Sequence, residues 1–386
     1  MLGAVGGFAH GPHAEEGEPR SAAVTTTRVL AVRLRWYERV PWRRVVLVVL
    51  GVAIVAVVVV GTMKTLGLPE AQRYTGQNWI NFVARGISQG AILAMIAIGY
   101  SLVYGILKMI NFAHGEVFMA GAFSSLFFAD AYARSGFLDR HPVAATLICV
   151  AVAVAASVLT AILLERLAYR PLRSAPRLVP LIAAVGASLF LQNAFRGFFG
   201  PQPRGYPRPQ VLGGQLSILG VPFQRMQVLV FVVAALSIVA LTFLVTRTKT
   251  GRSMRAVAED REIASLMGID VDRTIVVTFA IGGVFAGIAG VLYAMTFEQV
   301  QFTMGFRPGI AAFTAAVLGG IGSISGAALG GLLIGLLLNV GPALFLTGFG
   351  IPSPFSLRDA FVFLVLVLVL VFRPGGLLGT GEPEKV

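Results

Sequence analysis

Residues 225–246 read RMQVLVFVVAALSIVALTFLVT, an apolar run with no charged residue after its first position. About 20 such residues in a helix cross the hydrocarbon core of a bilayer. The run lacks the polar–apolar alternation of a transmembrane barrel strand, so it predicts a helix. Similar runs recur along the chain. We expect about ten spans, at 45–63, 80–106, 109–129, 144–165, 178–199, 225–246, 274–296, 310–328, 329–348 and 358–373. The predicted fold class is an all-α, polytopic transmembrane helical bundle.

The composition supports a membrane protein and excludes a soluble domain of this length. Of 386 residues, 56% are hydrophobic and 13% are charged, and the mean hydropathy is +0.81. The formal net charge of +13 comes from arginines beside the apolar runs. That placement is typical of cytoplasmic loops, whereas nucleic-acid binding needs a basic stripe interleaved with exposed aromatic residues. Cys149 is the only cysteine, so no disulfide or cysteine-based metal site can form within the chain.

The chain is expected to have three parts. Residues 1–43 are predicted to be a disordered, basic cytoplasmic tail. Residues 44–64 form an extra N-terminal transmembrane anchor, which we expect to stay uncleaved because no small-residue cleavage motif follows it. Residues 75–380 form the main transmembrane domain. Within it, the glycine-rich stretch 310–348 can be two short helices or a re-entrant segment followed by one span.

Arginine-rich connections predict the orientation of the spans. Two of them, residues 166–177 and 247–273, are separated by two spans and should both be cytoplasmic. Counting along the spans then places both termini in the cytoplasm. The loop 200–224 would be external although it carries Arg204 and Arg208.

Ionisable side chains stand close to the start of one predicted span. The segment 101–118 reads SLVYGILKMINFAHGEVF, with His114, Gly115 and Glu116 just inside the apolar run. Ionisable groups are costly in lipid, so they should face protein or water. Three interpretations remain open: a local pair at the cytoplasmic membrane edge, a polar lining of a translocation path, or a proton relay.

The charged segment 246–273 is expected to contain a short cytoplasmic helix. Residues 253–267 are rich in good helix formers, Gly268 suits a left-handed helix end, and Asp270 can cap the next span. Such a helix can dock into a groove of a partner or can be a solvated surface helix. Glycines at every fourth position, as at Gly322, Gly326 and Gly330, predict close helix packing or an irregular stretch near a pore.

Taken together, the sequence resembles the LivH-type branched-chain amino-acid permeases of ABC importers over about residues 80–379. The resemblance is carried by GISQGAILAMIAIGYSLVYGILKMINFAHGEVFMAGAF (86–123), ERLAYRPLRSAPRLVPLIAAVGASLFLQN (165–193), TGRSMRAVAEDREIASLMGIDVDR (250–273), AAVLGGIGSISGAALGG (315–331) and VFRPGGLLG (371–379). Members commonly begin near the span expected at 80–106, so the preceding 79 residues depart from the pattern.

This resemblance implies a multi-pass subunit of the bacterial cytoplasmic (inner) membrane that catalyses no reaction and carries no cofactor or metal. A homologous second permease, two ABC ATPase subunits that bind ATP, and an extracytoplasmic solute-binding protein are the implied partners. The segment 253–268 matches the coupling helix that rests on the ATPase, at Arg255, Ala256, Ala258, Asp260, Ala264 and Gly268. The candidate residues for the substrate path are Tyr104, Asn111, His114, Glu116, Gln192 and Asn193.

Alternative functions remain at this point. The same permease type also serves urea and short amides. A secondary transporter without ATPases would need its own ion site near mid-membrane, and the spans hold no deep cluster of carboxylates. A membrane enzyme would need a nucleophile or metal-ligand constellation, which the sequence lacks. The chain contains no phosphate-binding loop, so any ATPase must be another polypeptide.

Overall fold

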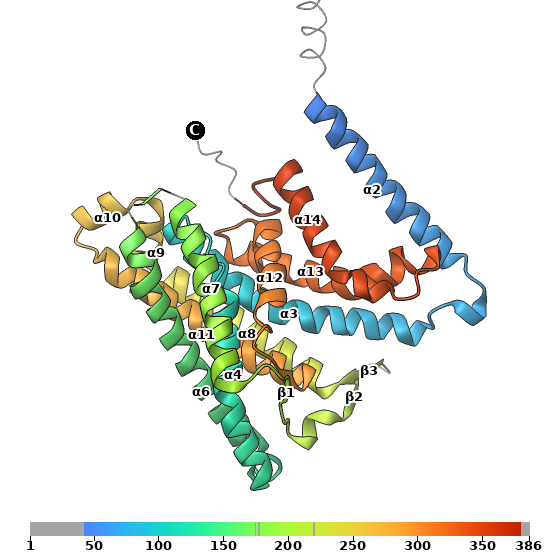
Figure 1. Ribbon diagram of the computed structural model, residues 1–386, viewed down its shortest axis with the longest axis horizontal. Helices are drawn as coiled ribbons and strands as arrows, with labels where there is room; N and C mark the ends of the chain where they lie inside the picture. Colours follow the sequence, from blue (N-terminus) through green and yellow to red (C-terminus); the bar gives the residue numbers. More distant parts are fainter. Residues whose placement is uncertain (1–41, 174, 177, 219–220, 380–386) are drawn as a thin grey trace, which may run out of the picture. The chain divides into compact units, whose positions relative to one another are not determined.

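The computed structural model describes residues 42–173, 175–176, 178–218 and 221–379 (Figure 1). Most of the predicted tail, residues 1–41, lies outside this range. The chain divides into two units, 1–59 and 60–386. Helix α2 (Trp42–Leu66) begins in the first unit, where the side chains of Val48, Val52 and Val55 are exposed, as expected of an apolar helix that faces lipid.

The second unit is a bundle of long apolar helices. They are α3 (Gly76–Leu107), α4 (His114–Arg134), α6 (Pro142–Leu164), α7 (Leu178–Phe199), α8 (Arg225–Arg247), α11 (Val271–Phe297), α12 (Phe306–Gly319), α13 (Ile324–Phe345) and α14 (Arg358–Phe372). Among the described residues, eight helices, including α2, are long and apolar enough to cross a membrane. The other two expected spans correspond to α4 and to α12, which has only 14 residues.

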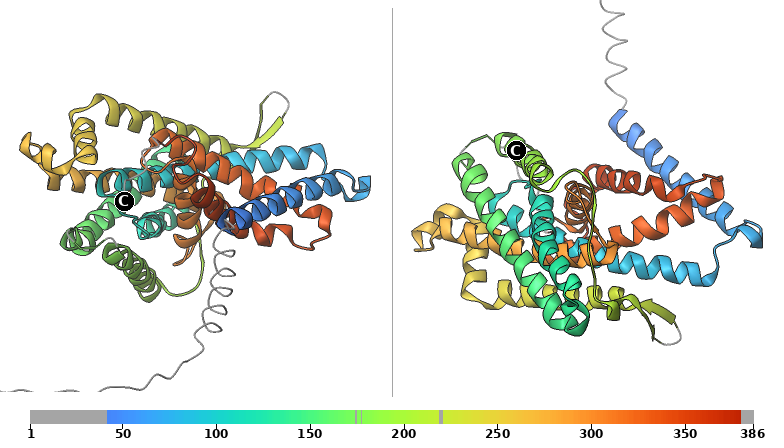
Figure 2. Two further views of the ribbon diagram at one scale, coloured as in Figure 1. Left: turned by 90° about the horizontal axis from the view of Figure 1, so that it is seen from above. Right: turned by 60° about the horizontal axis from the view of Figure 1, so that its bottom comes forward.

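Short elements occupy the two ends of the second unit. Helices α9 (Lys249–Glu259) and α10 (Arg261–Leu266) lie at one end, called the α10 end below. The hairpin of β2 (Gln215–Ile218) and β3 (Val221–Gln224) lies at the other, the hairpin end (Figures 1 and 2). Strands β1 (Arg204–Gly205) and β4 (Gln299–Val300) pair there too, and α5 (Phe137–Arg140) follows α4.

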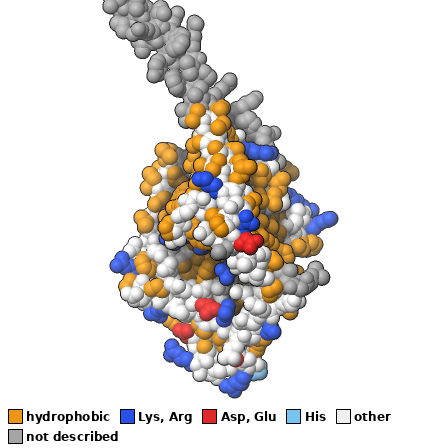
Figure 3. Space-filling view, turned by 90° about the vertical axis from the view of Figure 1, so that its right-hand side faces the viewer, with side chains coloured by type: hydrophobic (Ala, Val, Ile, Leu, Met, Phe, Trp, Pro, Cys, Tyr) orange, Lys and Arg blue, Asp and Glu red, His pale blue; other side chains and the backbone are white. Residues whose placement is uncertain are grey.

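Local sequence signals set the helix boundaries. The side chain of Thr75 accepts a hydrogen bond from Asn78 N at the start of α3, and Asp270 accepts one from Arg273 N at the start of α11. The prediction that Asp270 caps this span is confirmed. Hydrophobic side chains are widespread and acidic ones few on the face shown in Figure 3. This surface composition fits contact with lipid.

Glycines explain where the structure differs from the expected helices at 310–328 and 329–348. The break lies at residues 320–323 instead, because Gly320 and Gly322 adopt left-handed φ angles of 109° and 93°. Ser323 then caps α13 by accepting a hydrogen bond from Gly326 N. Gly331, near the expected break, lies inside α13 and packs against Ala94 of α3. The stretch is therefore one short helix followed by one helix of spanning length.

Candidate functional site

A cavity of about 400 Å³ lies among α3, α4, α7 and α12. Tyr100 of α3, Glu116 of α4 and the first turn of α12 border it, and α7 contributes Ser188 and Gln192. The remaining wall is mostly apolar, with Val185, Leu189 and Ile310 among the lining residues. A largely apolar cavity with a few convergent polar groups is the usual form of a small-molecule site.

The start of α4 lies deep within the bundle. The His114 imidazole packs against Gly99 of α3 and Gly282 of α11, where an added Cβ would come within 2.1 Å and 3.5 Å of the ring. Gly99 precedes the end of α3 by eight residues, and Gly282 follows the start of α11 by eleven. At about 1.5 Å per helical residue, His114 therefore lies about 12–16 Å inside those helix ends. This depth argues against the membrane-edge interpretation.

Glu116 is the buried acid of the cavity and is 1% exposed. Its Oε1 accepts hydrogen bonds from Gln192 Nε2 at 2.8 Å and from Ser188 Oγ at 3.1 Å. Within the described part of the chain, its Oε2 has no hydrogen-bond partner. Because buried polar atoms are almost always hydrogen-bonded, the free oxygen requires an explanation.

Glycines bring the start of α12 against this carboxyl group. A Cβ on Gly305 would lie 2.6 Å from Glu116 Oε2 and 2.4 Å from Gly115 O, so any larger residue would displace one of them. One turn further, a Cβ on Gly309 would lie 3.3 Å from both Gly115 Cα and the Tyr100 hydroxyl. With 14 residues, α12 is about 21 Å long, shorter than the roughly 30 Å hydrocarbon core. Its N-terminus therefore borders the cavity at depth.

The structure brings together some of the predicted path residues. Glu116 and Gln192 share the cavity, while His114 is buried beside it with its ring centroid 5.0 Å from that of Tyr100. Asn111 is buried and accepts a 2.6 Å hydrogen bond from the Tyr169 hydroxyl.

Two other predicted residues do not line the cavity. Tyr104 is half-buried, and Asn193 is exposed and donates to Leu189 O of its own helix. The sequence reasoning missed Tyr100 and Ser188. Ser188 precedes Gln192 by one helical turn, and this spacing was the available signal.

The expected single helix over 253–268 is two helices. The backbone is extended at Asp260, whose side chain accepts hydrogen bonds from Glu262 N and Ile263 N and so begins α10. Gly268 has a φ of 81°, as predicted for a left-handed helix end. The other residues expected in the coupling helix differ in exposure. Arg255 donates a hydrogen bond to Val245 O, Ala256 and Ala258 are half-buried, and Ala264 is buried.

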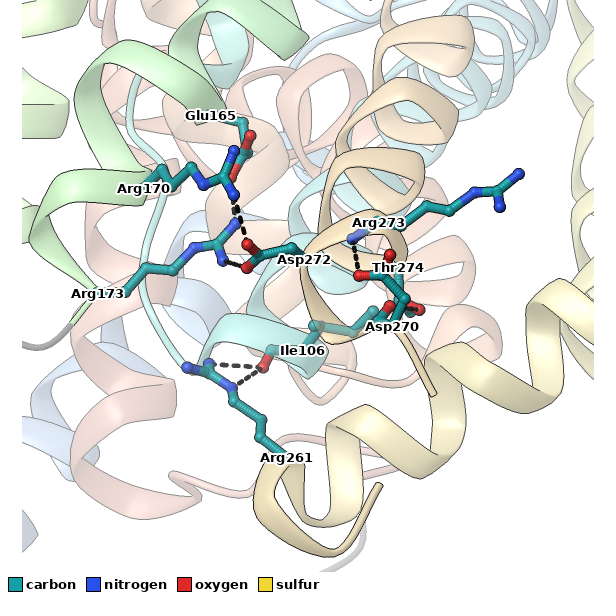
Figure 4. A network of polar contacts seen from close by, with 9 residues as sticks. All are labelled: Ile106, Glu165, Arg170, Arg173, Arg261, Asp270, Asp272, Arg273 and Thr274. Atoms are coloured by element: carbon teal, nitrogen blue, oxygen red, sulfur yellow. Dashed lines mark hydrogen bonds and ion pairs between the residues drawn. The ribbon is translucent and has the colours of Figure 1, made fainter. Parts of the chain in front are cut away.

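A polar network at the α10 end joins four parts of the chain in two pairs (Figure 4). Arg173 pairs with the buried Glu165 and with Asp272 in the first turn of α11, and Arg170 also pairs with Asp272. Arg261 of α10 donates to Ile106 O near the end of α3, at 2.8 Å from Nη2. Burial, with the nearby charge of Arg173, lowers the pKa of the Arg261 guanidinium. The network thus connects α10 to α3 and the 165–173 segment to α11.

A second cavity, of about 630 Å³, lies at the hairpin end and is more polar. Arg85, Arg208 and Arg358 line it, and Arg208 pairs with Glu298 at 2.7 Å. Gln89 accepts a hydrogen bond from Asn339 Nδ2 on its wall. No group of three or more His, Cys, Asp or Glu side chains that could hold a metal occurs in the described ranges.

Comparison with known proteins agrees with this architecture. The family model described as "Branched-chain amino acid transport system / permease component" matches residues 82–370. The chain belongs to this family. The match covers the cavity residues, both arginine-rich connections and all but the last residues of α14, and it begins after α2.

Individual relatives of this permease are named accordingly. The high-affinity branched-chain amino acid transport system permease protein BraD of Pseudomonas aeruginosa is 42% identical over 83% of this chain and 100% of its own length. The permease protein LivH of Escherichia coli K12 is 40% identical over 78% of this chain and 96% of its own. A probable LivH of Methanocaldococcus jannaschii is 28% identical over 76% of this chain and 92% of its own. No solved structure matches the chain.

Proposed function

We propose that this permease is one membrane-spanning half of an ATP-driven importer for branched-chain amino acids in the bacterial cytoplasmic membrane. It would work with a homologous second permease, two ATPase subunits and an extracytoplasmic solute-binding protein. The names of the relatives support the solute class. The observation that carries the proposal is the deep cavity with its buried Glu116 and apolar walls, because it suits a small solute with one charged and one apolar part.

The arginines of the α10 end support a cytoplasmic position for it, with the hairpin end outside. The more polar cavity at the hairpin end would then face the solute-binding protein. A solute would pass from it to the deep cavity. An ATP-driven cycle would expose this path alternately to the two sides.

Uptake by cells tests the solute. In cells lacking the gene we expect radiolabelled leucine uptake to fall at least tenfold and to return when the gene is restored. Urea and alanine uptake are measured alongside in the same cells. Loss and recovery of urea uptake with unchanged leucine uptake would contradict the proposed solute while keeping the importer architecture.

The tip of α10 is proposed to contact an ATPase subunit. Ile263, Leu266 and Met267 are 60%, 83% and 77% exposed, and a cluster of exposed apolar side chains usually marks an interaction site. We therefore expect a cysteine at Leu266 to crosslink to a nucleotide-binding subunit in native membranes. Cys149 is buried and should not react.

A matched control lies two residues away on the same helix. Ala264 is 3% exposed and faces this chain, so a cysteine there should crosslink at least tenfold less than one at Leu266. Equal yields at both positions, or no crosslink from Leu266→Cys in membranes that transport leucine normally, would show that α10 does not dock in this way.

A further inference from the structure

We propose that the deep cavity is a binding site for the zwitterionic head group of an α-amino acid, with Glu116 receiving the ammonium and the N-terminus of α12 facing the carboxylate. This inference rests on the proposed function and specifies its chemistry within this single chain. It distinguishes an amino-acid path from a path for urea or other neutral amides.

The hydrogen bonds of Glu116 leave one acceptor for the solute. Oε1 is already engaged by Gln192 and Ser188, which fixes the orientation of the carboxyl group. Oε2 is buried without a partner in the described structure and lies against Gly305, and both residues line the cavity. A primary ammonium supplies three N–H donors and a positive charge, and hydrogen bonds between charged groups are about twice as strong as neutral ones.

The first turn of α12 provides the complementary charge. A helix N-terminus carries about half a positive charge. In this turn Phe306 N donates to Thr303 O and Pro308 has no N–H, so the helix dipole, and not a set of free N–H groups, attracts the carboxylate. Gly305, Phe306 and Gly309 place this turn on the cavity wall beside Glu116. An amino acid bound there meets a negative group for its ammonium and a positive helix end for its carboxylate. A neutral amide carries no charge and so gains neither of these two interactions.

Apolar residues complete the site. Val185 and Leu189 of α7 and Ile310 of α12 also line the cavity. A cavity of about 400 Å³ exceeds what a urea molecule fills and suits a branched aliphatic side chain. Such walls stabilise each buried methylene by about 0.8 kcal/mol, so the site should favour leucine over alanine.

The test is competition for tritiated leucine on the full-length chain, co-purified with its partner subunits, washed free of solute-binding protein and placed in lipid nanodiscs. The competitors are 3-methylbutylamine, which keeps the ammonium, and 4-methylpentanoate, which keeps only the carboxylate. We expect the amine to compete at least tenfold better than the acid. This ranking needs no variant, so it is independent of any folding defect.

The variant Glu116→Gln keeps the size of the side chain and an acceptor for Ser188 and Gln192 but removes the charge. We expect at least tenfold weaker leucine binding and loss of the amine's advantage over the acid. Glu70→Gln, at an exposed glutamate near the start of α3, should bind as the unmodified protein does.

Two results would overturn the inference: equal competition by amine and acid, or unchanged binding by Glu116→Gln. Neither would affect the proposed function if cells still took up leucine through this gene. Conversely, gene-dependent uptake of urea instead of leucine would reject the proposed solute itself.

Discussion

Replacing Gly335 with alanine should prevent α3 and α13 from packing and leave little correctly folded protein. A Cβ at this position would lie 2.2 Å from Gly90 Cα and 2.5 Å from Gly86 O. These are backbone atoms, which cannot rotate away as a side chain does, so the two helices must separate. Since close packing drives helix association in lipid, the loss extends along the interface. We expect a cost of about 3 kcal/mol, at the upper end of overpacking effects.

The measurement is thermal unfolding of the purified protein in detergent, with size-exclusion chromatography to detect misfolded material. Gly186→Ala is the matched control, because Gly186 lies within α7 and an added Cβ would meet nothing within 4 Å. There the substitution should be neutral or stabilising by up to about 1 kcal/mol, since alanine favours helix more than glycine does. Equal unfolding temperatures for the two variants would show that the α3–α13 contact is looser than described.

Helix boundaries were predictable where the apolar run and the local signals agree. The run 178–199 predicts α7 to the residue, and 225–246 ends one residue before α8 does. Asp270 and Gly268 mark the start of α11 and the turn before it, because a cap and a left-handed turn depend on nearby sequence. These features need no knowledge of distant contacts.

The depth of the site was not predictable, because it depends on tertiary packing. From the sequence, residues 109–113 are the start of a predicted span, and the membrane edge was one of three positions or roles left open for His114 and Glu116. In the structure, α4 begins beside Gly99 and Gly282, deep within the bundle. The absence of side chains at these two positions makes room for the His114 ring. Only a contact between segments far apart in the chain, such as 99 and 282, reveals that depth.

The angular positions of residues around α7 explain why only some of the predicted path residues line the cavity. Gln192 and Asn193 are adjacent in sequence and both were predicted to line the path. Neighbouring residues on a helix point about 100° apart, so only one of them can face Glu116. Gln192 does, together with Ser188 one turn earlier, while Asn193 faces outward. Because α7 is apolar almost all round, the one-turn spacing of Ser188 and Gln192 was the sequence signal for its inward face.

Replacing Arg173 with alanine should lower the free energy of unfolding by about 3 kcal/mol, because it leaves a buried carboxylate without its cationic partner. The Glu165 side chain is fully buried, and Arg173 is its paired cation and is only 16% exposed. Arg170→Ala is the matched control, since its pair with Asp272 is about half exposed on both sides. Exposed pairs contribute roughly 0–1 kcal/mol, so this variant should unfold almost as the unmodified protein does.

A double variant separates the buried charge from the simple loss of an arginine side chain. If the cost arises from an unpaired carboxylate, Glu165→Gln should restore part of the stability of Arg173→Ala, and a double-mutant cycle measures the recovery. No recovery would assign the effect to lost packing alone. Arg173 also pairs with Asp272 at the start of α11, but Arg170 pairs with the same carboxylate, so the 165–173 segment should keep one ion pair to that helix. The contact of Arg261 with Ile106 O does not involve Arg173, and α6 still packs on Gly283 and Gly287 of α11, so both of these connections should remain.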